Sequence, residues 1–163
     1  MGIIVSYRIV SDEDAIKAIE KNMNTEVDIE SILNQYNHCI KSFASFVKSW
    51  DPLYLLLNKI SDNNIFTKLR ENKQSGSTNE YSKIFHEDEI KILYEELQKI
   101  SIETLNNKLS HDESLKFDIS RQDGYSMEFI YNTDCIITEF QELKKAVNTA
   151  FNNNSKLIQI LFP

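Results

Sequence analysis

Glycine is scarce in this chain of 163 residues, and its scarcity excludes several kinds of phosphate-binding site. The chain has only Gly2, Gly76 and Gly124, which are too scattered to form a glycine-rich phosphate loop or a dinucleotide-binding turn. Both motifs need glycine where the backbone meets the phosphate. The serine hydrolase motif, with glycines flanking the serine, is excluded in the same way. The sequence therefore predicts no nucleotide chemistry through these motifs, and we expect no cofactor.

Cysteine and histidine are also few. The two cysteines, Cys39 and Cys135, lie far apart and give neither a disulfide framework nor a paired metal-binding motif. His38 adjoins Cys39, but adjacent helical side chains point about 100° apart and cannot form a thiolate pair directly. His86 has no second histidine four residues later, and His111 is a single imidazole beside two acids. We expect no metal site and no catalytic residue.

Long apolar runs and basic stretches are both absent. No segment approaches the roughly 20 apolar residues of a membrane span, and no secretory signal pattern opens the sequence. We therefore expect a reduced, cytoplasmic protein that does not associate with membranes. The formal net charge is −7. Direct nucleic-acid binding needs a basic footprint, so we do not expect it. An acidic surface favours basic partners or simply keeps a protein soluble.

The N-terminal half predicts one strand followed by helices. Residues 3–10 alternate as a mostly buried strand does, and Ser11 with the acids after it is typical of a helix start. Apolar residues from 29 to 47 recur at helical spacing and predict one amphipathic helix. Pro52 prevents that helix from continuing and begins a second one, which is apolar almost all round. Trp50 is predicted to fill the corner between the two helices.

The middle of the chain predicts a loop and two helices. Residues 72–80 carry no apolar side chain and include Gly76, which predicts a mobile polar loop. Residues 87–100 follow as an amphipathic helix with one apolar face. Ser101 is predicted to cap a further short helix that ends near Leu109.

The C-terminal part returns to strands. The alternation over residues 115–131, with Asp123-Gly124 at its centre, predicts a hairpin. A helix over 136–151 and a closing strand over 156–162 follow. We therefore expect residues 1–163 to form a single α+β domain. Its N- and C-terminal strands share one sheet, and several amphipathic helices pack around that sheet.

Two segments carry a resemblance to a known family. Lys48, Trp50, Leu53 and Leu56 follow a Lys-x-Trp-x-x-Leu-x-x-Leu pattern, and residues 85–90 begin a helix at the expected place. In this order, with the first strand and the final helix and strand, they resemble the YfbM-like family of uncharacterised bacterial proteins. The chain looks like a divergent member, since His86 and Glu87 stand where the family prefers a cap and a proline. The resemblance implies an α+β fold and no established activity.

The absence of catalytic motifs favours a non-enzymatic cytoplasmic binding protein. Specifically, we interpret the chain as an immunity protein that neutralises a basic bacterial toxin domain. Opposite charge would speed association with such a partner. The candidate partner-binding residues lie on the predicted helix at 87–100, on the side away from its apolar stripe. They are Glu87, Asp88, Glu95 and Glu96.

Two alternatives remain at this point. The chain could be a small hydrolase or ligand-binding enzyme whose site is assembled from distant residues, with Lys48, Tyr81 and His86 as the pocket candidates. It could also be an acidic scaffold without a ligand. Convergent polar groups in one deep pocket would favour the enzyme, and a flat acidic surface would favour the binding protein.

Overall fold

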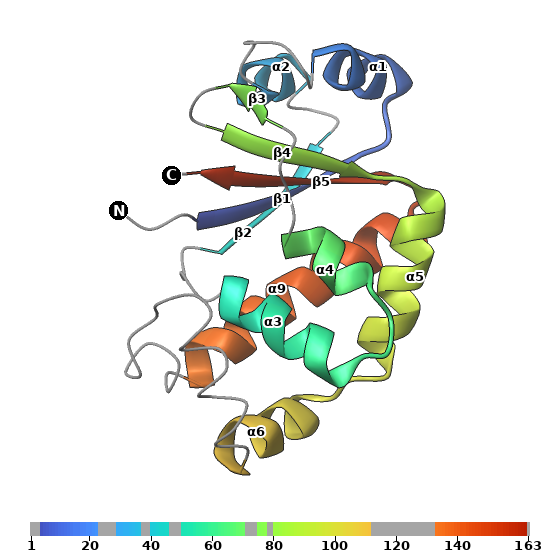
Figure 1. Ribbon diagram of the computed structural model, residues 1–163. Helices are drawn as coiled ribbons and strands as arrows, with labels where there is room; N and C mark the ends of the chain where they lie inside the picture. Colours follow the sequence, from blue (N-terminus) through green and yellow to red (C-terminus); the bar gives the residue numbers. More distant parts are fainter. Residues whose placement is uncertain are drawn as a thin grey trace.

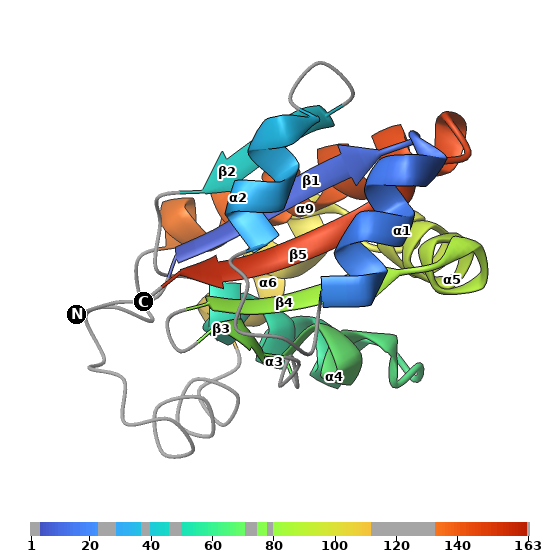
Figure 2. The same ribbon diagram turned by 90° about the horizontal axis from the view of Figure 1, so that it is seen from above.

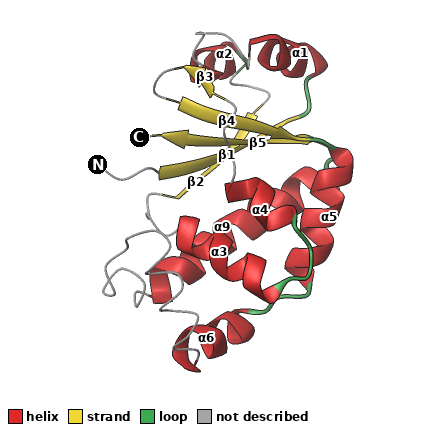
Figure 3. Ribbon diagram, viewed as in Figure 1, coloured by secondary structure: helices red, strands yellow, loops and turns green. Residues whose placement is uncertain are grey.

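The structure is a computed structural model that describes residues 4–22, 29–36, 40–45, 50–70, 75–77, 80–111 and 133–162. In it, an antiparallel five-stranded sheet in the order β2-β1-β5-β4-β3 carries helices on both faces (Figures 1 and 3). The strands are β1 (Ile4–Val10), β2 (Ile40–Ser45), β3 (Ser75–Ser77), β4 (Glu80–Phe85) and β5 (Lys156–Phe162). The helices are α1 (Glu13–Asn22), α2 (Ile29–Gln35), α3 (Trp50–Ile60), α4 (Ile65–Arg70), α5 (Glu87–Gln98), α6 (Ile102–His111) and α9 (Thr133–Asn152).

The first and last strands lie side by side in the middle of the sheet. β1 pairs with β5 along its whole length, with Val5 opposite Leu161 and Val10 opposite Lys156. Figure 2 shows this blue and red pair flanked by β2 and β4. The predicted α+β fold, with both terminal strands in one sheet, is confirmed.

Alternation along the strands divides the core between the two faces of the sheet. On β1, Val5, Tyr7 and Ile9 are buried against α3, α5 and α9, which form the larger cluster. On the other face, Ile158 and Ile160 of β5 are buried against α1 and α2 in a smaller cluster. The helices cover the sheet from both sides because successive residues of a strand point to opposite faces.

The predicted single helix over residues 29–47 is wrong. Helix α2 ends at Gln35, and residues 40–45 form β2, which pairs with the outer edge of β1. The apolar spacing fits a helix, but residues 40–45 can satisfy their backbone groups on an open strand edge, and that tertiary pairing overrides the local pattern.

The helix starts lie within three residues of the positions that the sequence predicts. Helix α3 begins at Trp50, with Pro52 in its first turn, where its missing N–H is tolerated. Ser101 caps α6 as predicted, because its hydroxyl accepts the backbone N–H of Thr104 at 3.0 Å. At α1 the cap is Asp12 rather than Ser11, since Asp12 Oδ1 accepts the backbone N–H of Ala15 at 2.8 Å.

Two further predictions concern the loop at 72–80 and the hairpin at 115–131. Within the predicted loop 72–80, residues 75–77 form β3 and Glu80 begins β4, because backbone pairing between these strands does not require apolar side chains. The mobility of that loop stays a prediction. The predicted hairpin over 115–131 lies outside the described residues.

In the part of the chain that the structure describes, no helix is both long and apolar enough to cross a membrane.

Candidate functional site

A row of polar residues crosses the face of the sheet that packs against α3, α5 and α9. Tyr7 of β1 is paired with Gln159 of β5, which is paired in turn with Lys83 of β4. The next row toward the start of β5 is apolar and buried, with Ile9, Leu157 and Phe85 in the same order. Tyr7 and Gln159 are fully buried, whereas Lys83 is half-buried at the outer end of the row. Polar side chains therefore interrupt an apolar surface in the larger core.

Four buried polar residues of the larger core are joined by a chain of hydrogen bonds. Gln159 Nε2 donates to the hydroxyl of Tyr54 on α3 at 2.9 Å, and the hydroxyls of Tyr54 and Tyr7 are hydrogen-bonded. Tyr7 donates to Oε1 of Glu139 on α9 at 3.4 Å. Each tyrosine has one proton, so Tyr54 must donate to Tyr7 while it accepts from Gln159. We call Gln159, Tyr54, Tyr7 and Glu139 the buried relay, since all four are 0% exposed.

Burial keeps both tyrosines of the relay in their neutral form. It is the main cause that raises the pKa of Tyr7 and of Tyr54 well above that of an exposed tyrosine, and the charge of Glu139 raises both further. The phenols therefore act as hydrogen-bond donors at neutral pH and not as nucleophiles. None of the four relay residues lines the groove beside Glu96 that is described below.

Trp50 packs against Tyr54 of the relay, and an ion pair between Asp51 and Arg70 lies next to Trp50 in the sequence. The ring of Trp50 is 5.7 Å from the ring of Tyr54, one helical turn further along α3, and Trp50 is half-buried against the larger core. Beside it, the nearly buried Asp51 accepts from Arg70 Nε at 2.7 Å and ties α3 to α4. These contacts give Trp50 a packing role against Tyr54 and the larger core.

The structure separates the four acidic residues that the sequence groups together. Glu87, Asp88 and Glu95 are exposed on α5. The side chain of Glu96 is only 13% exposed. It accepts from Lys99 Nζ at 2.5 Å and from Ser61 Oγ at 2.7 Å. The hydrogen bond from Lys99, followed by that from Ser61, lowers the pKa of the Glu96 carboxyl.

Glu96 therefore belongs to a polar groove between two helix ends. Ser61, Asp62 and Asn63 of the turn between α3 and α4 line this groove together with Glu96 and Lys99, and its volume is about 340 Å³. The contacts of Glu96 hold the end of α5 against that turn. A direct role of Glu96 in binding a partner would require these hydrogen bonds to break.

The structure places two of the three predicted pocket residues at opposite ends of one strand. Tyr81 is the second residue of β4, and His86 follows the last. Their Cα atoms are about 16 Å apart, at five times the rise per residue of a strand. His86 is exposed at the start of α5, where its backbone N–H donates to Glu89 Oε2 at 3.3 Å. Lys48 lies outside the described residues.

The ends of β1 and β4 place two acidic helix starts at the same end of the sheet. Both strands are antiparallel to β5 and flank it, so both end where β5 begins. Helices α1 and α5 start directly after them, at the right-hand end of the sheet in Figure 1. We call the acidic residues of these two starts the acidic rim; they are Asp12, Glu13, Asp14, Glu87, Asp88 and Glu89.

Of the acidic rim, only Glu87 and Asp88 were predicted from the sequence as partner-binding residues. Glu13, Asp14, Glu87 and Asp88 are exposed, while Asp12 and Glu89 are half-buried. Glu89 is paired with Lys68 at 3.3 Å. The available signal was that each acidic run directly follows a strand, but placing the runs together requires the strand order. Over the described ranges, no group of three or more histidines, cysteines or acids has the arrangement of a metal site.

Comparisons with known proteins identify a family without a known activity. A family model described as a domain of unknown function (DUF1877) matches residues 1–160. No curated protein matches the sequence. Among solved structures, the chain is similar to the crystal structure of a protein of unknown function, YfbM from Escherichia coli. The TM-score is 0.61 at 13% identity, and the match covers 96% of this chain and 99% of that one.

Proposed function

Because this chain belongs to the DUF1877 family, as its resemblance to YfbM-like proteins predicts, no relative supplies an activity, and we propose a function from its own surface. It is a non-enzymatic binding protein that holds a basic protein partner against the acidic rim. The observation that carries the proposal is the placement of two exposed acidic helix starts at one end of the sheet.

Each acidic run has a local explanation, but their placement together does not follow from it. Acids in the first turn stabilise any helix by about 0.3–1 kcal/mol through the helix dipole. That effect explains Asp14 on α1 and Glu87 on α5 separately. Among the described residues, Asp14, Glu87 and Asp88 make no ion pair. Exposed carboxylates from two helices add their fields and attract a cationic surface over about 8 Å at physiological salt.

The partner that we propose is a cognate basic toxin domain, which would make this chain an immunity protein. The net charge of −7 and the absence of catalytic motifs support that role. Carboxylates can stand in for the phosphates that a basic nuclease binds, and complementary charge speeds association. The alternative, a small hydrolase or ligand-binding enzyme, has less support because Tyr81 and His86 lie at opposite ends of β4.

The test is co-expression with a candidate basic toxin domain, sought first among the neighbouring genes, followed by binding kinetics at low and high salt. Reversal of two rim charges, Glu87→Lys with Asp88→Lys, should slow association more than tenfold at low salt, as expected for electrostatic steering. The matched control is Glu103→Lys with Asp134→Lys. It changes the net charge equally at exposed positions on α6 and α9.

Three results would contradict the proposal. An equal loss in the control would assign the effect to net charge and not to the acidic rim. An association rate that does not respond to salt would contradict steering. Failure of the toxin domain to bind at all would remove the immunity role, and turnover of a small molecule would favour the enzyme.

A further inference from the structure

The polar groove beside Glu96 has walls from two separate elements, and the structure describes both. The turn between α3 and α4 forms one wall with Ser61, Asp62 and Asn63, and the end of α5 forms the other with Glu96 and Lys99. Figure 3 shows this turn passing beside the last part of α5. The volume of the groove, about 340 Å³, lies within the range of sites that bind small organic molecules, about 300–1,000 Å³.

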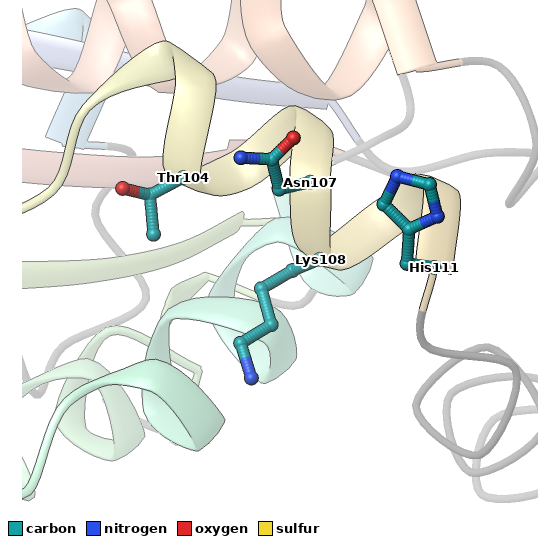
Figure 4. Close-up of a pocket in the computed structure, with 4 residues that line it drawn as sticks. All are labelled: Thr104, Asn107, Lys108 and His111. Carbon is teal, nitrogen blue, oxygen red and sulfur yellow. The ribbon is translucent and has the colours of Figure 1, made fainter.

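A larger cavity beside α6 is built differently. The described residues in its lining, Thr104, Asn107, Lys108 and His111, all belong to that one helix (Figure 4). Figure 4 shows Lys108 pointing away from Asn107 and His111, so these side chains do not converge on one group of a ligand. The groove beside Glu96 instead brings polar groups of two elements to face each other.

Two helices end at the polar groove and make it electronegative. Helix α3 ends at Ile60 and α5 ends at Gln98. The carbonyl groups at each helix C-terminus carry the equivalent of about half a negative charge. Glu96 and Asp62 add two carboxylates, and Lys99 supplies the one ammonium group of the described lining. The groove therefore has an excess of negative charge and attracts cations.

Lys99 shows which kind of group this groove holds. Its Nζ donates to Glu96 Oε1 at 2.5 Å, while Ser61 Oγ donates to Oε2 at 2.7 Å. The hydrogen bond to Glu96 is the main cause that raises the pKa of Lys99, and the charge of Asp62 also raises it. The side chain of Lys99 is nevertheless 67% exposed. Since an exposed ion pair contributes little to stability, the ammonium group of a ligand can replace Nζ at small cost.

We propose that the polar groove binds a short aliphatic diamine. One ammonium group of the ligand replaces Lys99 Nζ on Glu96, and Lys99 turns into solvent, so that two carboxylates match the two charges of the diamine. Asp62 is exposed and makes no ion pair within the described ranges, and it accepts the second ammonium group. Ile60 and Ile100, which also line the groove, contact the methylene chain of the ligand.

This site is separate from the acidic rim and does not depend on the proposed protein partner. The rim lies at the start of α5 and the groove at its end. The helix has 12 residues, so the two sites are about 18 Å apart at 1.5 Å per residue.

The experiment follows backbone amide NMR signals while 1,4-diaminobutane is added at constant ionic strength. We expect saturable shifts centred on residues 60–63 and 95–100. Butylamine has a single ammonium group on the same chain, and it should bind the same amides about fivefold more weakly, as expected for the loss of one exposed ion pair. Shifts that do not saturate, or that centre on the acidic rim, would overturn the proposal. Equal affinity for butylamine would overturn the diamine as the ligand.

Two exposed residues of the groove should change binding in opposite directions. Asp62→Asn removes the second carboxylate and should weaken 1,4-diaminobutane binding about fivefold, whereas Lys99→Met removes the competing ammonium group and should tighten binding about threefold to fivefold. The matched controls, Asp88→Asn and Lys91→Met, make the same changes at exposed positions of α5 outside the groove and should leave binding unchanged. Equal effects in the controls would assign binding to net charge and overturn the site, as would unchanged binding in both groove variants.

Discussion

Replacement of Tyr54 by phenylalanine tests whether the buried relay stabilises the fold. The change removes one oxygen and leaves the ring, so packing against Trp50 is kept. Two hydrogen bonds are lost, one from Gln159 and one to Tyr7. Each buried partner then lacks a bond whose removal costs about 1–3 kcal/mol. We expect Tyr54→Phe to lower the free energy of unfolding by about 2–4 kcal/mol.

The assay is equilibrium unfolding in urea, read by circular dichroism and extrapolated to water. Tyr94→Phe is the matched control. Its ring stacks on Phe151 at 4.1 Å, and its hydroxyl makes no hydrogen bond with any described residue. We expect the control to cost less than about 0.5 kcal/mol, as is usual for changes away from buried networks.

A double-mutant cycle separates the relay from general damage to the core. Tyr7→Phe alone removes the bond to Glu139 and the acceptor of Tyr54. The double variant loses the bond between the two hydroxyls only once, so its cost should fall short of the sum by about 1 kcal/mol or more. Additive costs would refute the reasoning, as would a Tyr54→Phe variant as stable as Tyr94→Phe.

The remaining predictions concern two residues outside the relay. Trp50→Ala should lower the free energy of unfolding by about 2–3 kcal/mol in the same urea assay, below the roughly 3–5 kcal/mol of a fully buried aromatic, because Trp50 is half-buried; a loss under about 1 kcal/mol would show that Trp50 contributes little to the core. The pKa of the Glu96 carboxyl is lower in the folded state than its ordinary value of 4.5. The ionised carboxylate therefore stabilises the protein at pH values above 4.5, and this stabilisation is lost as the pH falls through the pKa of the folded state. Glu96→Gln should therefore lower stability at pH 7 and flatten the decline in stability below pH 4.5, measured by urea unfolding at several pH values; an unchanged pH profile would contradict the hydrogen-bonded role of Glu96.

Apolar periodicity predicted the helices and strands whose own sequence has a clear repeat. β1, α5, α9 and β5 have clear apolar spacing over their whole lengths, and the structure has them where the sequence predicts them. β2 was missed because its apolar residues fit a helical spacing, and the segment becomes a strand only when the edge of β1 is available. Such a pairing depends on a partner 30 to 40 residues away, which a local window does not contain.

The buried relay left a partial signal in the sequence. Gln159 occupies an inward position of β5, between Leu157 and Leu161 on the same face. A polar residue at such a position predicts a buried hydrogen-bond partner. The sequence does not reveal which partner it is, because Tyr54 lies 105 residues away along the chain. Only the packing of α3 and α9 on the sheet brings the four together.

The position of β5 between β1 and β4 has a consequence for synthesis on the ribosome. Residues 156–162 are translated long after β1 and β4, yet both of those strands pair with them. While they are still untranslated, the described strands offer β1 a pairing with β2 alone, and they offer β4 only the three residues of β3. Pairings between distant parts of a chain form slowly and leave strand edges open in the meantime. We therefore expect nascent chains that lack this segment to depend on chaperones and to be degraded readily.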